Sequence, residues 1–338
     1  MRSSIERRAV TVSLCHRVTL SSCQKSEAPH IMQKKAGRMH KRSLGARLWR
    51  GRIAYAMVLP TFLMLFLFLY YPATMGLYRS LFQWSAGAEA KFVGLDNFVT
   101  LFTKDRVFQA SLGHVVQLAA WYLFSTLVLS IGMALLIHRL RNHGAKYFFR
   151  LFTVLPVIIP GIVLIMLWKF IYDASIGPLN ALLIGVGLEE WTRAWLSDPN
   201  TALNAVMLRN FPWTDGVATL IFLAGLQAIP VEVVESSMLD GAGGWRRLWS
   251  IELPLIAGQI KLISVLTIIG GVQEFTAVFA MTQGGPINAT MVPGMWMYWN
   301  AFGINKMGYA SAIGVVMFII TMILTLINMR YITTSHEA

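Results

Sequence analysis

Charged residues and cysteines are scarce in this sequence. Charged side chains make up 13% of the 338 residues, whereas 56% are hydrophobic. This composition excludes an ordinary soluble domain and is typical of an integral membrane protein. The two cysteines, Cys15 and Cys23, both lie near the N-terminus. We therefore expect neither a disulfide framework nor a cysteine zinc site.

Motifs for nucleotide hydrolysis and for nucleophilic catalysis are also missing. The chain contains neither a Gly-x-x-x-x-Gly-Lys phosphate loop nor a Gly-x-Ser-x-Gly elbow. His138 and His143 have a spacing that zinc could use, but no cysteine pair or nearby carboxylate completes a site. We therefore expect this chain to bind no cofactor or metal and to have no enzyme activity of its own.

Positive charge is concentrated at the N-terminus. Residues 1–52 hold thirteen of the 29 Lys and Arg residues against Glu6 and Glu27, which gives this segment a charge of +11. Residues 1–51 lack apolar periodicity and are expected to form a disordered tail. Beside a membrane span, such a basic tail marks the cytoplasmic side more often than a nucleic-acid partner. No nucleic acid is therefore expected as a partner.

Six apolar stretches in residues 52–335 predict an all-α transmembrane domain. Each can supply a membrane span, and they lie near residues 53–71, 115–137, 151–170, 205–229, 260–282 and 308–330. Pro72 is expected to end the first helix, and Pro156 and Pro160 should kink the third. The fourth stretch is short, so it must extend back through Asp215 toward Arg209 or begin at an interface.

The basic residues between these stretches predict the orientation. Arg139, Arg141, Lys146 and Arg150 follow the second span with no acid among them. Such a cluster is typical of a cytoplasmic loop. Because six spans return the chain to its starting side, we expect both termini in the cytoplasm.

A short, mostly polar segment at residues 235–254, ESSMLDGAGGWRRLWSIELP, lies between the fourth and fifth stretches. Pro230 can open a helix before it, and the Asp240–Gly241 dipeptide should stop that helix. Trp245, Leu248 and Trp249 then recur at helical spacing. The segment therefore predicts a cytoplasmic helix–turn–helix lying against the membrane.

The spacing in this segment resembles the EAA loop of permease subunits of ATP-binding cassette (ABC) importers. That signature is Glu-Ala-Ala, three residues, Gly, nine residues and Ile-x-Leu-Pro, and Ser236 and Ser237 here replace the alanines. In that family the loop is a coupling helix that docks in a groove of the ATPase. The resemblance assigns this role to Glu235, Ser236, Ser237, Asp240, Gly241, Ala242, Ile251, Leu253 and Pro254. An ordinary cytoplasmic loop is the alternative.

The C-terminal part resembles sugar-type permeases of the maltose and glycerol-3-phosphate kind. The matching residues are Thr282, Gly284, Gly285, Pro286, Thr290, Tyr298, Phe302, Gly308, Tyr309 and Ala310. FVGLDNF, at residues 92–98, resembles a further segment of that family on the outer side. Together these resemblances cover about residues 45–335.

The resemblance implies a multi-pass protein of the bacterial inner membrane that imports a sugar or related polyol by alternating access. Its implied partners are a second permease subunit, an ABC ATPase dimer that binds ATP and magnesium, and an extracytoplasmic solute-binding protein. A six-span secondary transporter or a membrane enzyme is the alternative function. The first would typically show an internal repeat and buried ionisable pairs, and the second a catalytic cluster. The sequence shows neither convincingly.

Gln273 and Glu274 interrupt the fifth stretch. An ionisable group inside a span costs roughly 2.5–3.5 kcal/mol, so Glu274 is a candidate functional residue. Gln273 matches a glutamine of the family, whereas Thr276 stands where the family frequently has Asp. Either Gln273, Glu274 and Thr276 belong to the sugar path, or Glu274 forms a hydrogen bond to the partner permease.

Overall fold

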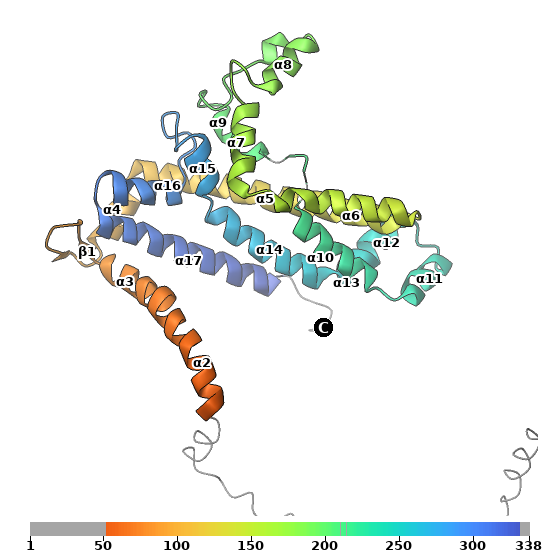
Figure 1. The fold of residues 1–338 in the computed structure, drawn as a ribbon, viewed down its shortest axis with the longest axis horizontal. Coiled ribbons are helices and arrows are strands. Elements are labelled where there is room, and N and C mark those ends of the chain that lie inside the picture. The colour runs from red at the N-terminus through yellow and green to blue at the C-terminus, as the bar shows by residue number, and fades with distance from the viewer. Residues whose placement is uncertain (1–51, 210, 214, 332–338) are drawn as a thin grey trace, which may run out of the picture. The chain divides into compact units, whose positions relative to one another are not determined.

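The computed structural model describes residues 52–209, 211–213 and 215–331, so the predicted tail at residues 1–51 lies outside the described residues. The described residues are mostly helical (Figure 1). Their strands are β1 (Phe82–Gln83) and β2 (Lys91–Phe92), which pair antiparallel. The chain divides into two units, residues 1–63 and residues 64–338.

The helix of the first apolar stretch continues through Pro72. It comprises α2 (Arg52–Leu65), the π-helical turn η1 (Phe66–Tyr70) and α3 (Tyr71–Arg79). The expectation that Pro72 ends this helix is therefore wrong. The wide turn before Pro72 bonds the Tyr71 N–H to the Phe66 carbonyl, which gives the proline ring room within a continuing helix.

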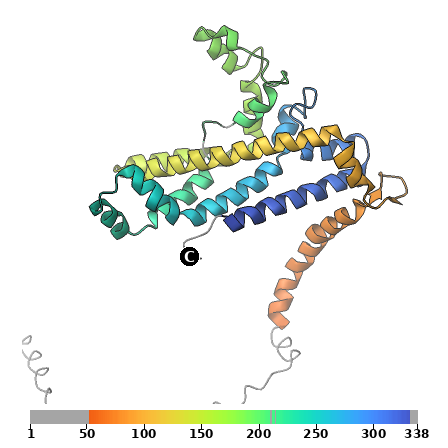
Figure 2. The ribbon, with the colours of Figure 1, turned by 180° about the vertical axis from the view of Figure 1, so that it is seen from behind.

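Helix α5 (Arg106–Arg139) is the longest described helix, with 34 residues, and it contacts α10 (Gly216–Gln227) and α14 (Ala257–Val272) along its length (Figure 2). An added Cβ at Gly271 of α14 would lie 2.8 Å from the Cα of Ala119 in α5. Small residues let helix backbones approach closely in a membrane protein. Helix α17 (Met307–Tyr331) packs on the other side of α14.

The third stretch is bent at its second proline, as expected. Helices α6 (His143–Ile158) and α7 (Gly161–Ile171) meet at an angle of 92°. Pro160 lies in the break, whereas Pro156 is contained within α6. Proline removes a helical hydrogen bond and therefore favours such a break.

The fourth and fifth stretches are not the continuous helices expected over residues 205–229 and 260–282. Helix α9 (Ala202–Leu208) is separate, and α10 starts at Gly216 because the Asp215 carboxylate accepts hydrogen bonds from the next N–H groups. Helix α14 ends at Val272, and α15 (Thr276–Met281) starts only after Phe275. The Glu274 carboxylate accepts a hydrogen bond from the Ala277 N–H, which favours this restart.

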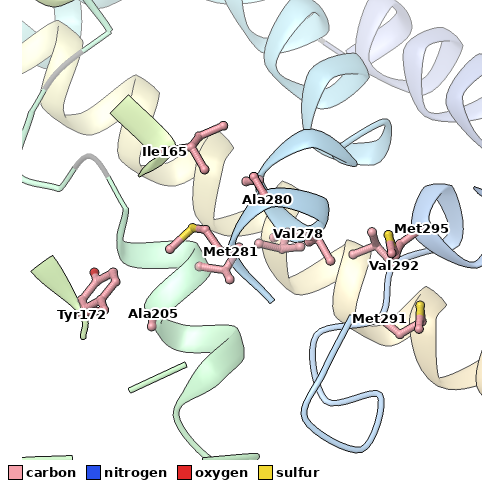
Figure 3. Close-up of a cluster of buried hydrophobic side chains, with 12 residues drawn as sticks. Ile165, Tyr172, Ala205, Val278, Ala280, Met281, Met291, Val292 and Met295 are labelled. Carbon is pink, nitrogen blue, oxygen red and sulfur yellow. The ribbon is translucent and has the colours of Figure 1, made fainter. Parts of the chain in front are cut away.

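The remaining short elements lie between these helices. They are α4 (Asp96–Thr103), α8 (Pro178–Gly185), the 3₁₀ turn η2 (Glu189–Trp191), α11 (Val231–Leu239), α12 (Gly244–Arg247), the π-helical turn η3 (Leu248–Glu252), α13 (Leu253–Leu255), α16 (Pro293–Tyr298) and the π-helical turn η4 (Trp299–Gly303). A buried apolar cluster joins α5, α7, α9, α15 and α16, and includes Ile165, Val278 and Met295 (Figure 3).

Within the described residues, three helices are long and apolar enough to cross a membrane, and up to six spans result if each bent helix pair counts as one. The three are Tyr55–Arg79, Arg106–Arg139 and Met307–Arg330. The pairs are α6 with α7, α10 with α11, and Gly244–Leu255 with α14. A multi-pass helical protein follows, while the number six stays a prediction.

Candidate functional site

The predicted coupling segment folds as a helical hairpin, α11 followed by the continuous helical residues Gly244–Leu255. Gly241 follows the end of α11 with a φ of +73°, the left-handed conformation that glycine adopts most easily. The Ala242 N–H bonds to the Ser237 carbonyl at 2.9 Å, and the Gly241 N–H to the Met238 carbonyl at 3.1 Å. These two bonds form a Schellman motif. The predicted helix stop at Asp240–Gly241 is therefore confirmed.

The tip of the hairpin exposes large apolar side chains. Leu239 is 89% exposed, Trp245 74% and Trp249 58%. The two tryptophan rings meet edge to face with 5.9 Å between their centroids, as their helical spacing predicted. An exposed apolar group of this kind is typical of a surface that contacts another protein or a membrane.

The other residues of the predicted segment separate into two groups. A shallow groove of about 280 Å³ between α11 and the second helix is lined by Ser236, Ser237, Asp240, Ala242 and Ile251, among others. The serine hydroxyls donate to the carbonyls three residues earlier, so they do not project as free donors. Glu235 and Pro254 are exposed and do not line this groove, and Leu253 is partly buried.

Sequence reasoning missed Glu252, the unspecified residue of Ile-x-Leu-Pro. Its carboxylate is buried and accepts from Arg139 at 3.2 Å and from Arg247 at 3.0 Å. Arg139 is the last residue of α5, so its pair with Glu252 fastens the hairpin to the longest described helix, whereas Arg247 belongs to the hairpin itself. The sequence feature that could have identified Glu252 is that it is a single acidic residue near basic residues in a mostly apolar segment.

At the break between α14 and α15, Glu274 forms an ion pair with Arg209 within the same chain. Only 11% of the Glu274 side chain and 14% of the Arg209 side chain are exposed. The Nε of Arg209 also donates to the Tyr122 hydroxyl at 3.2 Å, which links the pair to α5. This pairing is a third arrangement, different from the sugar contact and the partner-permease bond weighed for Glu274.

The neighbours of Glu274 are more open. Gln273 and Thr276 are both exposed. Phe275, Phe279 and Tyr298 form a ring cluster beside them, with centroid distances of 5.2–5.5 Å. The break thus combines exposed polar groups with aromatic faces, a pairing that suits sugar hydroxyls and sugar rings.

At the other end of α5, Asp105 joins three helices. It caps α5 through the Phe108 N–H and accepts from the Trp296 indole at 2.7 Å and the Tyr309 hydroxyl at 2.6 Å. Tyr309 belongs to the matched C-terminal pattern, and Trp296 lies in α16. The structure gives both side chains a contact that holds the helices together. Asn97 of FVGLDNF similarly donates to the Ser80 and Phe82 carbonyls.

Among the residues that the structure describes, no group of three or more His, Cys, Asp or Glu side chains is close enough to hold a metal ion.

Comparison with known proteins agrees with this helical membrane architecture. The family model for the binding-protein-dependent transport system inner membrane component matches residues 126–334. The chain is 35% identical to the probable ABC transporter permease protein YurN of Bacillus subtilis, over 84% of this chain and 97% of that protein. It is 33% identical to the diacetylchitobiose uptake system permease protein NgcF of Streptomyces coelicolor, over 69% of this chain and 68% of that one.

A solved structure shows the same fold. The crystal structure of a bacterial ABC transporter involved in the import of the acidic polysaccharide alginate matches with a TM-score of 0.75. The match covers 86% of this chain and 99% of that chain at 23% identity.

These observations define a multi-pass inner-membrane subunit of a transporter, not an enzyme. The chain belongs to the family of binding-protein-dependent transport system inner membrane components. The resemblance to ABC importer permeases is thereby confirmed.

Proposed function

We propose that this chain is a permease subunit of an ABC importer for a sugar or a sugar-derived solute. The observation that carries the proposal is its similarity, over most of its length, to permeases named for transport systems. The named cargo of one relative, diacetylchitobiose, and that of the structural neighbour, alginate, are both saccharides. Secondary transporters and membrane enzymes are disfavoured by the same similarity.

The proposed complex contains three kinds of partner. A second permease subunit completes the translocation path, an ATPase dimer supplies ATP and magnesium, and a solute-binding protein delivers the cargo. A second matching crystal structure, of a bacterial alginate ABC transporter, is in complex with an alginate pentasaccharide-bound periplasmic protein, which supports the last of these. Both termini of the chain lie in the cytoplasm in this arrangement, because the basic segments favour that side.

The hairpin at α11 and α12 is the proposed contact with the ATPase. Its exposed Leu239, Trp245 and Trp249 supply an apolar surface. The ion pair between Glu252 and Arg139 connects that surface to α5, so motion of the ATPase would be transmitted to the spans. Glu235 is exposed on α11 and would orient the contact through polar bonds.

The break at Gln273, Glu274 and Thr276 is the proposed segment of the sugar path. Exposed polar side chains there can exchange hydrogen bonds with sugar hydroxyls. Exposed aromatic groups nearby, such as Phe302 at 70%, offer apolar faces to a sugar ring.

Gly241→Asp tests the coupling contact. The open space around the Gly241 Cα holds no atom within 4 Å of an added Cβ, and Asp tolerates a positive φ better than most residues. The variant should therefore insert and fold, but lose uptake and recover less ATPase when the tagged permease is purified from membranes. Glu235→Ala should act in the same direction more mildly.

Gly87→Asp is a matched control, because Gly87 also has a positive φ, +85°, and open space around it, but lies in the β1–β2 turn. It should keep both uptake and ATPase recovery. Normal ATPase recovery and uptake in Gly241→Asp would remove the basis for a coupling role of the hairpin.

A further inference from the structure

Helix α5 ends and α6 begins at the end of the bundle that carries α11 (Figures 1 and 2). Residues of this region line a cleft of about 540 Å³. His138 of α5 contributes to its polar lining, and so does one face of α6. His143, Lys146 and Arg150 share that face, because they lie at i, i+3 and i+7. The apolar lining comes from Leu226, Ile229, Val231 and Val234. The cleft thus has an apolar part and a polar part that is rich in basic side chains.

Positive charge in this cleft is not balanced by carboxylates. Glu252 is the acid that lines it, and both of its oxygens are already engaged by Arg139 and Arg247. The ion pairs found among the described residues do not include Lys146 or Arg150. An anion that enters the cleft would therefore meet cations without having to displace an existing partner.

Two side chains of the lining contain a buried nitrogen that lacks a partner. Within the described part of the chain, neither Nε of Arg150 nor Nδ1 of His138 has a hydrogen-bond partner. The guanidinium N–H is always a donor, and buried donors in proteins are nearly always matched by an acceptor. A ligand with several anionic oxygens would supply the missing acceptor in a charge-assisted bond.

We propose that this cleft binds a phosphate group. Phosphate oxygens match Lys146, Arg150 and the histidines in charge and in hydrogen-bonding capacity. The apolar lining suits the glycerol and first methylenes of an anionic phospholipid, and basic pockets between cytoplasmic span ends favour such headgroups. Free inorganic phosphate presents the same group without the apolar part.

The site also connects to the proposed coupling hairpin. Val231 and Val234 of α11 line the cleft, so a bound phosphate lies against the same helix that ends at the Schellman turn. Occupancy would therefore restrain α11 relative to α6. This consequence for transport rests on the proposed function, whereas the binding itself does not.

The experiment uses the full-length chain, purified and reconstituted in nanodiscs of phosphatidylcholine with or without phosphatidylglycerol. Retained lipid is identified by native mass spectrometry, and inorganic phosphate is titrated separately by calorimetry in detergent. The variant is the double substitution Lys146→Gln with Arg150→Gln. Because each cation near a headgroup contributes severalfold to binding, we expect affinity to fall at least about tenfold.

Two single variants serve as controls. Arg141→Gln removes one positive charge, from an exposed residue just before α6 that does not line the cleft. This variant should bind as the parent does. Arg150→Lys keeps the charge and should retain most of the binding. Elution volume in size-exclusion chromatography establishes that every variant is folded before its binding is measured.

The outcomes separate the possible sources of the phosphate. Selective retention of phosphatidylglycerol that the double variant loses and Arg141→Gln keeps supports the site with a lipid occupant. The same pattern with inorganic phosphate alone supports the site with a free anion. Binding of neither by the folded parent, or equal loss in Arg141→Gln, overturns the proposal. The proposal is also overturned if bound ATPase protects Lys146 from an acylating reagent while neither phosphatidylglycerol nor inorganic phosphate does.

Failure of the coupling proposal would be distinguishable from failure of this one. Gly241 does not line the cleft, so Gly241→Asp should leave lipid and phosphate binding unchanged whatever it does to uptake.

Discussion

The ion pair between Arg209 and Glu274 gives the sharpest test of how the break between α14 and α15 is held. Both side chains are almost fully buried, and Glu274 also accepts a hydrogen bond from the Ala277 N–H at 3.0 Å. Glu274→Gln leaves a buried guanidinium without its counter-charge. Removing one partner of a buried pair costs about 3–5 kcal/mol, and the amide oxygen that remains places this variant near 3 kcal/mol. With an unfolding entropy of about 2.1 cal/mol/K per residue, that loss lowers the Tm of a 338-residue chain by about 4 °C.

Two further variants should lower Tm by smaller amounts than Glu274→Gln does. Tyr122→Phe removes only the hydroxyl that accepts from Arg209 at 3.2 Å, so Tm should fall by about 1–2 °C. Arg209→Met combined with Glu274→Leu removes both charges and should regain much of the stability that Glu274→Gln loses. The measurement is the fraction of purified protein that stays monodisperse after a temperature ramp.

Transport kinetics decide whether Glu274 also faces the sugar. At equal membrane levels, a direct contact predicts a changed substrate affinity or selectivity in Glu274→Gln, whereas a purely structural pair predicts a loss of assembled protein. A Tm equal to that of the parent would refute the reasoning about the buried pair. Equal uptake kinetics would remove Glu274 from the proposed path.

Three other predictions concern the hairpin, the orientation of the chain and its N-terminal residues. Glu252→Gln should loosen the hairpin, so that trypsin cuts after Arg247 about tenfold faster in the purified protein, since a charged hydrogen bond contributes about 1.5–3 kcal/mol; an unchanged rate would contradict the fastening role. Reporters fused after residue 143 or 243 should read cytoplasmic and one after residue 290 external, and a cytoplasmic reading at 290 would exclude the six-span topology. Deletion of the residues before Met39 should leave insertion and transport intact, because Lys41 to Arg52 keep the orientation signal; loss of membrane protein on a blot would show that the deleted residues are needed.

Local signals in the sequence predicted the backbone well where one residue type dictates the geometry. Gly241 has the positive φ that the turn dipeptide indicated, and Pro160 lies in the break of the third stretch. Pro72 shows the limit of such reasoning, because a wide turn preceding it removes the conflict between its ring and the helix. That turn has no signature in the local sequence.

Long-range polar contacts could not be predicted, because they join residues distant along the chain. Arg209 and Glu274 are 65 residues apart, and Arg139 and Glu252 are 113 apart. Apolar stretch lengths also mispredicted the fourth and fifth helices. The carboxylates of Asp215, which is exposed, and of Glu274 accept hydrogen bonds from backbone N–H groups in the first turns of α10 and α15, and so set where these helices start.

The length of α5 has a mechanical consequence. Its 34 residues correspond to about 50 Å, more than the roughly 30 Å of membrane hydrocarbon. Asp105 ties one end to α16 and α17, and Arg139 ties the other to the hairpin. A rigid movement of α5 would therefore move the groups bound at both of its ends. A rigid tilt of about 5° around its midpoint displaces the two ends by about 2 Å in opposite directions. A displacement of this size is enough to break a hydrogen bond at either end.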